Sequence, residues 1–183
     1  MPPLMRMFKR LLGISPESES TEVRSIVIMQ RTAHAFTEAE LRVAAERGWA
    51  RKFDGRDDPM YFVSADHSFL NVVKAGPHLL RVTSMPCRFS DDDKYVLSQL
   101  PQPEQKKAWG EHHAHTILDL FNDLSSTDKR ITDADAYAAL AKLAVQLGDS
   151  NCAGIILPDK NIMMPNDGAA EQGLWFLINK EFF

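Results

Sequence analysis

The chain has 183 residues, of which 44% are hydrophobic and 25% charged, and a formal net charge of -4. This length suits one large domain or two small ones packed together, with a core that needs neither a disulfide nor a structural metal. The 21 basic and 25 acidic residues are interspersed. The sequence therefore lacks the basic patch typical of nucleic-acid-binding proteins, and we expect no nucleic-acid partner.

Residues 1–14 form an amphipathic N-terminal segment, and the polar, acidic residues 15–22 predict a linker behind it. Charged residues interrupt the apolar ones and no cleavage site follows, so we expect a cytoplasmic protein without an export signal. A helix in this segment could dock on a partner or touch a membrane surface, although one short segment binds lipid only marginally. The alternative is a frayed leader or a helix packed on its own domain. The apolar residues at helical spacing are Leu4, Met7, Phe8, Leu11 and Leu12, and the cations are Arg6, Lys9 and Arg10.

The first half of the chain reads as a strand, a helix and a meander. Residues 23–29 are rich in β-branched side chains and predict a strand. In the helix that follows, Thr37 is the predicted N-cap, Glu40 occupies the capping-box position and Gly48 is the expected end. Three further strands are predicted at 60–65, 69–74 and 79–85, with turns at Asp66–Ser68 and at 75–78.

The second half replays this order. Residues 113–121 take the place of the first strand, and Thr132 caps a helix that ends at Gly148. A hairpin follows, with its turn at Asp159–Asn161. Thr132 follows Thr37 at nearly the same separation as Asp159 follows Asp66. These spacings predict an internal repeat.

We therefore predict an α+β fold built from two tandem strand–helix–hairpin repeats, each a ferredoxin-like half, with a mainly antiparallel sheet packed against helices. A helix starting at Ser90 and further helix at 103–110 form the connector, and residues 173–179, GLWFLIN, read as a last strand. The predicted organisation is an N-terminal segment and linker at 1–22 and one duplicated domain at 23–183, with repeat one at 23–89, connector helix at 90–110 and repeat two at 111–183.

Three stretches of the sequence carry a resemblance: HHAHTILDL, the Ala-rich helix after it, and CAGIILPDKNIMMPN. Over roughly residues 60–165 the chain resembles a bacterial domain family of unknown function. The resemblance implies a fold and a bacterial origin. It implies no chemistry and no catalytic residue.

The histidine-rich stretch 112–115 raises the question of a metal site. On a strand, His113, His115 and Asp119 would point to one face, and the two imidazoles would stand about 6–7 Å apart. That spacing permits a shared Zn²⁺ or another divalent ion if a third ligand arrives from elsewhere. The competing interpretation is structural, with imidazoles that bind backbone groups or line the sheet.

Other candidate sites have simpler explanations. The acids Asp91–Asp93 suit a helix N-terminus, and residues 54–58 suit a solvated turn rather than a calcium loop. His67 and His78 fall in predicted turns. The sequence contains no GxSxG nucleophile elbow and no Gly-rich phosphate loop. We expect the three tryptophans, Trp49, Trp109 and Trp175, to anchor the core, and the two cysteines, Cys87 and Cys152, to be reduced and buried.

The leading functional prediction is a non-enzymatic protein-interaction or regulatory module without a cofactor, which binds a protein partner or its own copy. Its basis is the lack of a catalytic constellation together with apolar strands at 162–165 and 173–179, which would leave adhesive edges. The alternative is a metal-dependent hydrolase or metal-binding regulator that uses His113 and His115. A peripheral membrane contact through residues 1–14 is the third possibility.

Overall fold

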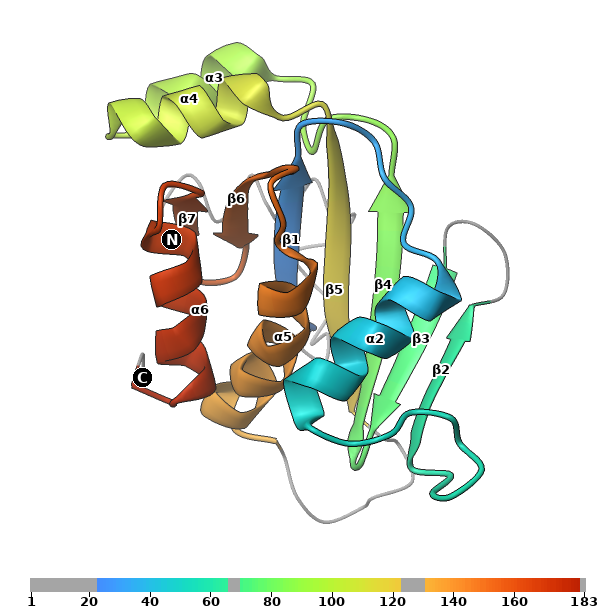
Figure 1. The fold of residues 1–183 in the computed structure, drawn as a ribbon. Coiled ribbons are helices and arrows are strands. Elements are labelled where there is room, and N and C mark those ends of the chain that lie inside the picture. Colours follow the sequence, from blue (N-terminus) through green and yellow to red (C-terminus); the bar gives the residue numbers. More distant parts are fainter. Residues whose placement is uncertain (1–22, 66–69, 123–130, 182–183) are drawn as a thin grey trace, which may run out of the picture.

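The computed structural model describes residues 23–65, 70–122 and 131–181. Seven strands form one sheet in the order β2-β3-β4-β5-β1-β6-β7 (Figure 1), and every neighbouring pair is antiparallel. The α+β class and the antiparallel sheet are thus confirmed. The strands are β1 (Arg24–Gln30), β2 (Tyr61–Ala65), β3 (Leu70–Ala75), β4 (His78–Met85), β5 (Ala114–Asn122), β6 (Cys152–Leu157) and β7 (Ile162–Pro165). The helices are α2 (Glu38–Trp49), α3 (Asp93–Gln99), α4 (Pro103–Glu111), α5 (Asp133–Leu147) and α6 (Ala169–Ile178).

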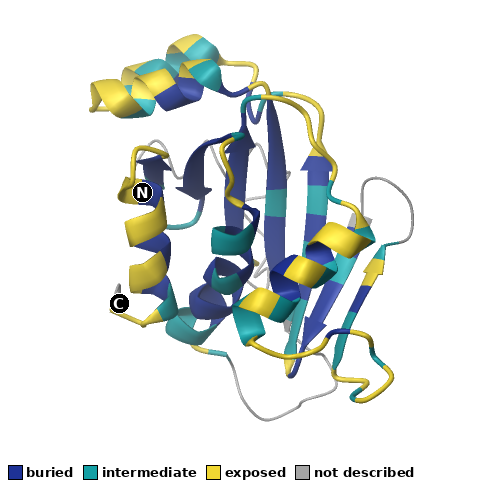
Figure 2. Cartoon of the chain, viewed as in Figure 1, coloured by how far each residue is buried: buried dark blue, intermediate teal, exposed yellow. Residues whose placement is uncertain are grey.

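Helices pack on both faces of the sheet. On what we call the near face, α2, α5 and α6 cover alternate strand residues such as Ile26 and Leu118, which are fully buried. On the far face, α3 and α4 enclose a second core with Val27, Met29 and the buried Trp109. Figure 2 shows the resulting dark interior on the central strands and the exposed outer sides of the helices. None of the described helices has the length and apolar content needed to cross a membrane.

The two predicted helix caps are confirmed. The Thr37 hydroxyl accepts a hydrogen bond from the Glu40 backbone at 3.3 Å, and the Glu40 carboxylate accepts one from the Thr37 backbone at 2.7 Å. The Thr132 hydroxyl accepts from the Asp135 backbone at 3.1 Å. Each helix therefore starts where its local sequence satisfies the first free backbone N–H groups.

The arrangement as two ferredoxin-like halves is not confirmed. The leading strands β1 and β5 lie side by side at the centre of the sheet, but β6 pairs with β1 and β4 pairs with β5. Each half thus places its hairpin beside the leading strand of the other half. The first half contributes three strands after its helix, whereas the second contributes two strands and α6. Both halves build one interleaved sheet.

The predicted strand at 173–179 is wrong, because this segment lies in α6. Its buried residues Ala170, Gly173, Leu174 and Leu177 recur at the helical spacing of three and four. An apolar run of seven residues does not by itself distinguish a strand from a helix. Here the buried stripe that begins at Ala170 decides in favour of a helix.

Two helix boundaries also differ from the prediction. Gly48 lies inside α2, where a Cβ atom would come within 2.8 Å of the Lys142 carbonyl oxygen of α5, so this glycine permits close helix packing. The helix ends instead at Ala50, whose φ is 50°. In the connector, Asp92 rather than Ser90 caps α3, with its carboxylate 3.1 Å from the Tyr95 backbone nitrogen. Residues 1–22 and the turn at 66–68, which includes His67, lie outside the described residues.

Candidate functional site

The three neighbouring histidines have different surroundings. His112 ends α4 and is fully buried, His113 is exposed ahead of β5, and His115 is 6% exposed on the far face. The His113 backbone N–H donates to the Gln30 carbonyl at 2.8 Å, and strand pairing then begins at Ala114. The strand therefore starts one residue later than predicted.

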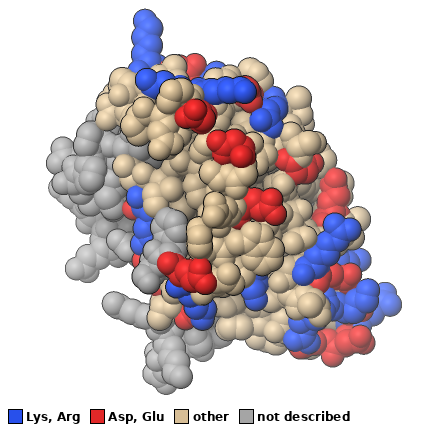
Figure 3. All heavy atoms as spheres, turned by 60° about the vertical axis from the view of Figure 1, so that its left-hand side comes forward, with Lys and Arg blue, Asp and Glu red and all other residues tan. Residues whose placement is uncertain are grey.

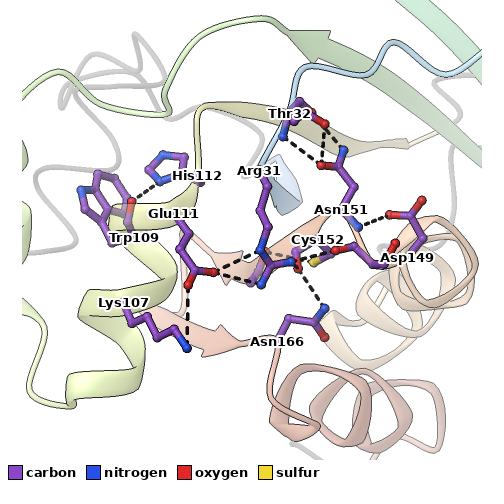
Figure 4. Close-up of polar contacts among 12 residues, drawn as sticks. Arg31, Thr32, Lys107, Trp109, Glu111, His112, Asp149, Asn151, Cys152 and Asn166 are labelled. Atoms are coloured by element: carbon purple, nitrogen blue, oxygen red, sulfur yellow. Dashed lines mark hydrogen bonds and ion pairs between the residues drawn. The ribbon is translucent and has the colours of Figure 1, made fainter.

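Both ring nitrogens of His112 are used within the fold. Its Nδ1 lies 2.5 Å from the Trp109 carbonyl oxygen, and its Nε2 lies 3.2 Å from the Phe89 backbone N–H (Figure 4 shows the Trp109 contact). Because a carbonyl only accepts and an N–H only donates, the ring is neutral with its proton on Nδ1. Burial lowers the pKa of His112 to about 4. His112 thus joins the connector helix to the loop before α3.

His115 keeps one nitrogen for a possible ligand. Its Nδ1 lies 2.8 Å from the Cys87 carbonyl oxygen and carries the proton, and its ring packs edge-on to Phe89 with centroids 5.1 Å apart. Burial lowers the pKa of His115, which favours the neutral ring. Only Nε2 could bind a metal.

Asp119 shares the far face with His115, as predicted, because the two residues pair with Ser25 and Met29 of β1. Four strand positions separate them, which corresponds to about 13 Å. The Asp119 carboxylate accepts from Ser25 Oγ at 2.6 Å and from Arg81 Nε at 3.0 Å. Sequence reasoning missed Arg81 and Ser25, which only the strand register reveals.

The metal hypothesis on His113, His115 and Asp119 gains no support from this geometry. His113 is exposed while Asp119 is bonded to Arg81 and Ser25. Among the described residues, no group of three or more His, Cys, Asp or Glu side chains is placed to hold a metal ion. Melting of untagged protein with and without a chelator remains the direct test of a bound ion.

A polar cluster around Arg31 lies at the end of β1 (Figure 4). Arg31 Nε lies 3.1 Å from a Glu111 carboxylate oxygen, and a terminal nitrogen lies 2.9 Å from the Ser150 carbonyl and also contacts the Cys152 carbonyl. The Asn166 amide donates to the same Cys152 carbonyl at 2.9 Å. Through Arg31, this cluster connects α4 to the end of β1 and the start of β6. The charges of Arg31 and Glu111 are paired with each other.

A small cavity of about 170 Å³ adjoins this cluster between α5, α6 and β6. It is below the 300–1,000 Å³ typical of ligand pockets. The Cys152 thiol on its wall is buried, and burial raises the pKa of Cys152 to about 11, so the thiol is protonated near neutral pH and is a weak nucleophile. The lining residues are Val145, Gly148, Cys152, Ile155, Asn166, Ala170, Glu171 and Leu174.

A second, partly buried charge cluster holds the β6–β7 turn against α5. The Tyr137 hydroxyl donates to Asp159, and Lys160 Nζ lies 2.6 Å from an Asp133 oxygen and 3.7 Å from an Asp159 oxygen. Burial raises the pKa of Asp159, whereas hydrogen bonds from Lys160 and Arg24 lower that of Asp133. The groups neutralise one another, which suits a structural role.

The acidic stretches behave as predicted. Asp92 caps α3, and Asp93 accepts from the Trp109 indole N–H at 2.9 Å. In the loop at 54–58, the Asp54 carboxylate accepts from the Arg56 and Asp57 backbone N–H groups at 3.0 and 3.4 Å, as in a tight turn.

Two predictions of burial are wrong. Cys87 is exposed, whereas Cys152 is buried as predicted. Trp175 is 48% exposed and its neighbour Phe176 is 42% exposed, although Trp109 is a core residue. The helical period of α6 explains the error, because Trp175 and Phe176 lie opposite the stripe that starts at Ala170.

The fold defines the chain as an α+β protein with one antiparallel sheet and helices on both faces. No protein-family model matches the chain, and neither the comparison with curated proteins nor that with solved structures gave a match. The resemblance to a bacterial domain family therefore stays a prediction. A functional proposal has to rest on the geometry of the described residues.

Proposed function

We propose that the protein is a protein-interaction module and that its docking surface is the outer stripe of α6. The single observation behind this proposal is the adjacent pair Trp175 and Phe176, which are 48% and 42% exposed on a helix whose other side is buried. Large aromatic side chains are enriched in protein–protein interfaces, where they contribute most of the binding energy. We define the α6 stripe as Glu171, Gln172, Trp175, Phe176 and Asn179, all of which are exposed.

The partner we propose is a second copy of the chain. Two α6 helices that meet antiparallel about a twofold axis between Trp175 and Phe176 would place the aromatic rings against each other. The same axis would set Gln172 opposite Asn179 of the partner copy. The stripe is thus complementary to itself in apolar character and hydrogen bonding.

The surroundings of the stripe agree with a weak interface. Figure 3 turns this side of the molecule forward and shows uncharged atoms interrupted by several acidic groups, with Lys and Arg mainly toward the edges. One helix pair buries less than the ~1,000 Å² typical of a stable complex. We therefore expect a dissociation constant of about 10 µM or weaker.

Pairing through the edge strand β7 is a less favoured route to self-association. The edge strand β7 spans only Ile162–Pro165 and ends in proline, and the Gln105 amide donates to its Met163 carbonyl at 2.9 Å. Short strands, proline and covered carbonyls protect an edge against further pairing. The docking surface we propose is therefore a helix face rather than a strand edge.

Sedimentation velocity over a range of concentrations tests the proposal. The full chain should shift from monomer to dimer, and the variant W175A/F176A should stay monomeric. Val43→Ala is the matched control, because Val43 is 46% exposed on α2, away from the stripe. A wild-type chain that stays monomeric at every concentration, or a dimer that survives W175A/F176A, would overturn the proposal.

We also infer that residues 23–89 and 111–183 descend from one duplicated unit. The leading strands β1 and β5 and the Thr37 and Thr132 caps support this inference. The interleaved hairpins match an exchange of equivalent elements between two copies, which is a low-cost way for two copies to associate.

A further inference from the structure

We propose that the N-terminal segment, residues 1–22, docks on the part of the far face that α3 and α4 leave open. We call this part the open half-face. It consists of the far-face side chains of β2, β3 and β4, together with those at the start of β1 and at the end of β5. Its apolar members are Phe62, Val72, Leu79 and Phe121, and its polar members are Ser25, Ser64, Lys74, Arg81 and Asp119. The proposal does not depend on the α6 stripe.

The strand register places these side chains in two adjacent rows. In the first row Phe62 pairs with Lys74, Lys74 with Leu79, and Leu79 with Phe121. In the second row Val72 pairs with Arg81, which pairs with Asp119 and so with Ser25. Directly opposite residues of antiparallel strands share a face, so all of these side chains point away from α2 and α5.

None of the described helices covers this half-face. The far-face cluster that contains α3 and α4 includes buried strand residues of β1, β6 and β7, with Ile117 of β5 packed against it, and no described residue of β2, β3 or β4. The apolar members of the open half-face are nevertheless only partly exposed, and Lys74 is 9% exposed. A strand cannot shield the solvent-facing side of its own side chains. The partial burial of these residues therefore agrees with a further part of the chain lying over them.

The N-terminal segment joins the described chain next to the open half-face. The described chain begins at Val23, and β1 begins at Arg24, beside Ser25 on the open half-face. Residues 15–22 can span up to about 26 Å when extended. The distance across the sheet from β1 to β2 is four strand spacings, or about 19 Å. Residues 1–14 would be about 21 Å long as a helix, so the segment can lie across the whole half-face.

The chemistry of the segment fits as well. Its apolar residues recur at helical spacing, so one helix side could meet the apolar row while the cations face water. Arg81 is paired with Asp119 and Arg24 with Asp133, so apolar packing rather than charge carries the proposed contact.

Limited trypsin digestion of the full chain tests the proposal. Cleavage after Arg10 in the wild type should be at least about tenfold slower than in Phe8→Asp, which puts a charge on the apolar side of the segment. Leu79→Asp should accelerate cleavage to the same extent from the other side of the contact. Val43→Asp, on α2, is the matched control and should leave the rate unchanged. Leu79→Asp could unfold the domain, which would also accelerate cleavage. Phe8 lies outside the described residues, so the comparison of Phe8→Asp with the wild type does not depend on Leu79→Asp.

Equal cleavage rates after Arg10 in the wild type and in Phe8→Asp would overturn the proposal. Cysteines placed at Phe8 and Phe121, in a chain without Cys87 and Cys152, should form a disulfide within one monomer. A disulfide only between chains would assign the half-face to a second copy and overturn the proposal. Protection that arises only with anionic vesicles would assign the segment to a membrane and overturn it too.

Discussion

Arg81 and Asp119 form an ion pair on the far face in which one partner is buried and the other half-exposed. Arg81 Nε and a terminal nitrogen lie 3.0 and 2.5 Å from one carboxylate oxygen, while Ser25 Oγ lies 2.6 Å from the other. The Asp119 side chain is 5% exposed and that of Arg81 is 43% exposed. The carboxylate therefore depends on these two partners for its solvation inside the protein.

Arg81→Met should leave Asp119 buried with Ser25 alone and should lower the free energy of unfolding by roughly 1–3 kcal/mol. The double variant R81M/D119L should recover part of this loss, because it also removes the buried charge. Urea denaturation at neutral pH measures both. Lys52→Met is the control, since its pair with Glu46 at 3.4 Å is largely exposed and should matter by less than about 0.5 kcal/mol. An Arg81→Met effect no larger than that of the control would contradict this account.

His112 should make the protein less stable in acid. Burial lowers the pKa of His112 from 6.5 to about 4, so between these values the unfolded chain binds a proton that the folded chain does not. Stability contributed by the neutral ring is complete above pH 6.5 and is lost as the pH falls toward 4. The loss amounts to at most about 3 kcal/mol.

His112→Gln should therefore show a weaker dependence of unfolding free energy on pH between 6.5 and 4 than the wild type. It should also be less stable at neutral pH, because glutamine cannot reproduce both contacts to Trp109 and Phe89. His113→Gln, at the exposed neighbour, is the control and should keep the wild-type slope. If unfolding free energy depends on pH equally in His112→Gln and in the wild type, His112 is not the cause of the loss of stability in acid.

Local signals in the sequence predicted the elements well. The caps at Thr37 and Thr132 were predictable because a cap involves only the next three residues. The alternation along β5, with Leu118 on the near face and His115 and Asp119 on the far face, was predictable because a strand has a period of two.

Features that depend on distant residues were not predictable. The sheet order follows from which hairpin pairs with which leading strand, and nothing local to β4 or β6 specifies that choice. The partner of Asp119 is Arg81, which only the β4–β5 register brings opposite it. The exposure of Trp175 was missed for a different reason, because an apolar run read as a strand has no outer helical side.

Two glycines in helices should respond oppositely to the same substitution. At Gly173 in α6, a Cβ atom would come within 2.2 Å of the Met164 sulfur, whereas at Gly110 in α4 nothing lies within 4 Å. Gly110→Ala should stabilise the protein by about 0.5–1 kcal/mol through helix propensity. Gly173→Ala gains the same propensity but must displace Met164, so we expect a net loss of roughly 1–2 kcal/mol. Thermal unfolding of both variants measures the contrast, and equal stabilisation would refute the close packing of α6 on β7.

The two cysteines should differ strongly in reactivity. Cys87 is exposed, whereas Cys152 is buried and its pKa is raised to about 11. The thiolate is the reactive form, and at pH 8 only about one Cys152 thiol in a thousand is ionised even before access is considered. A thiol-reactive dye should therefore label Cys152→Ser, which keeps Cys87, rapidly, and Cys87→Ser slowly. Both variants should react at similar rates in denaturant, because unfolding removes the burial that sets them apart. Rapid labelling of native Cys87→Ser would mean that the cavity between α5 and α6 opens readily to solvent, contrary to the packing of Leu174 and Ile155 around it.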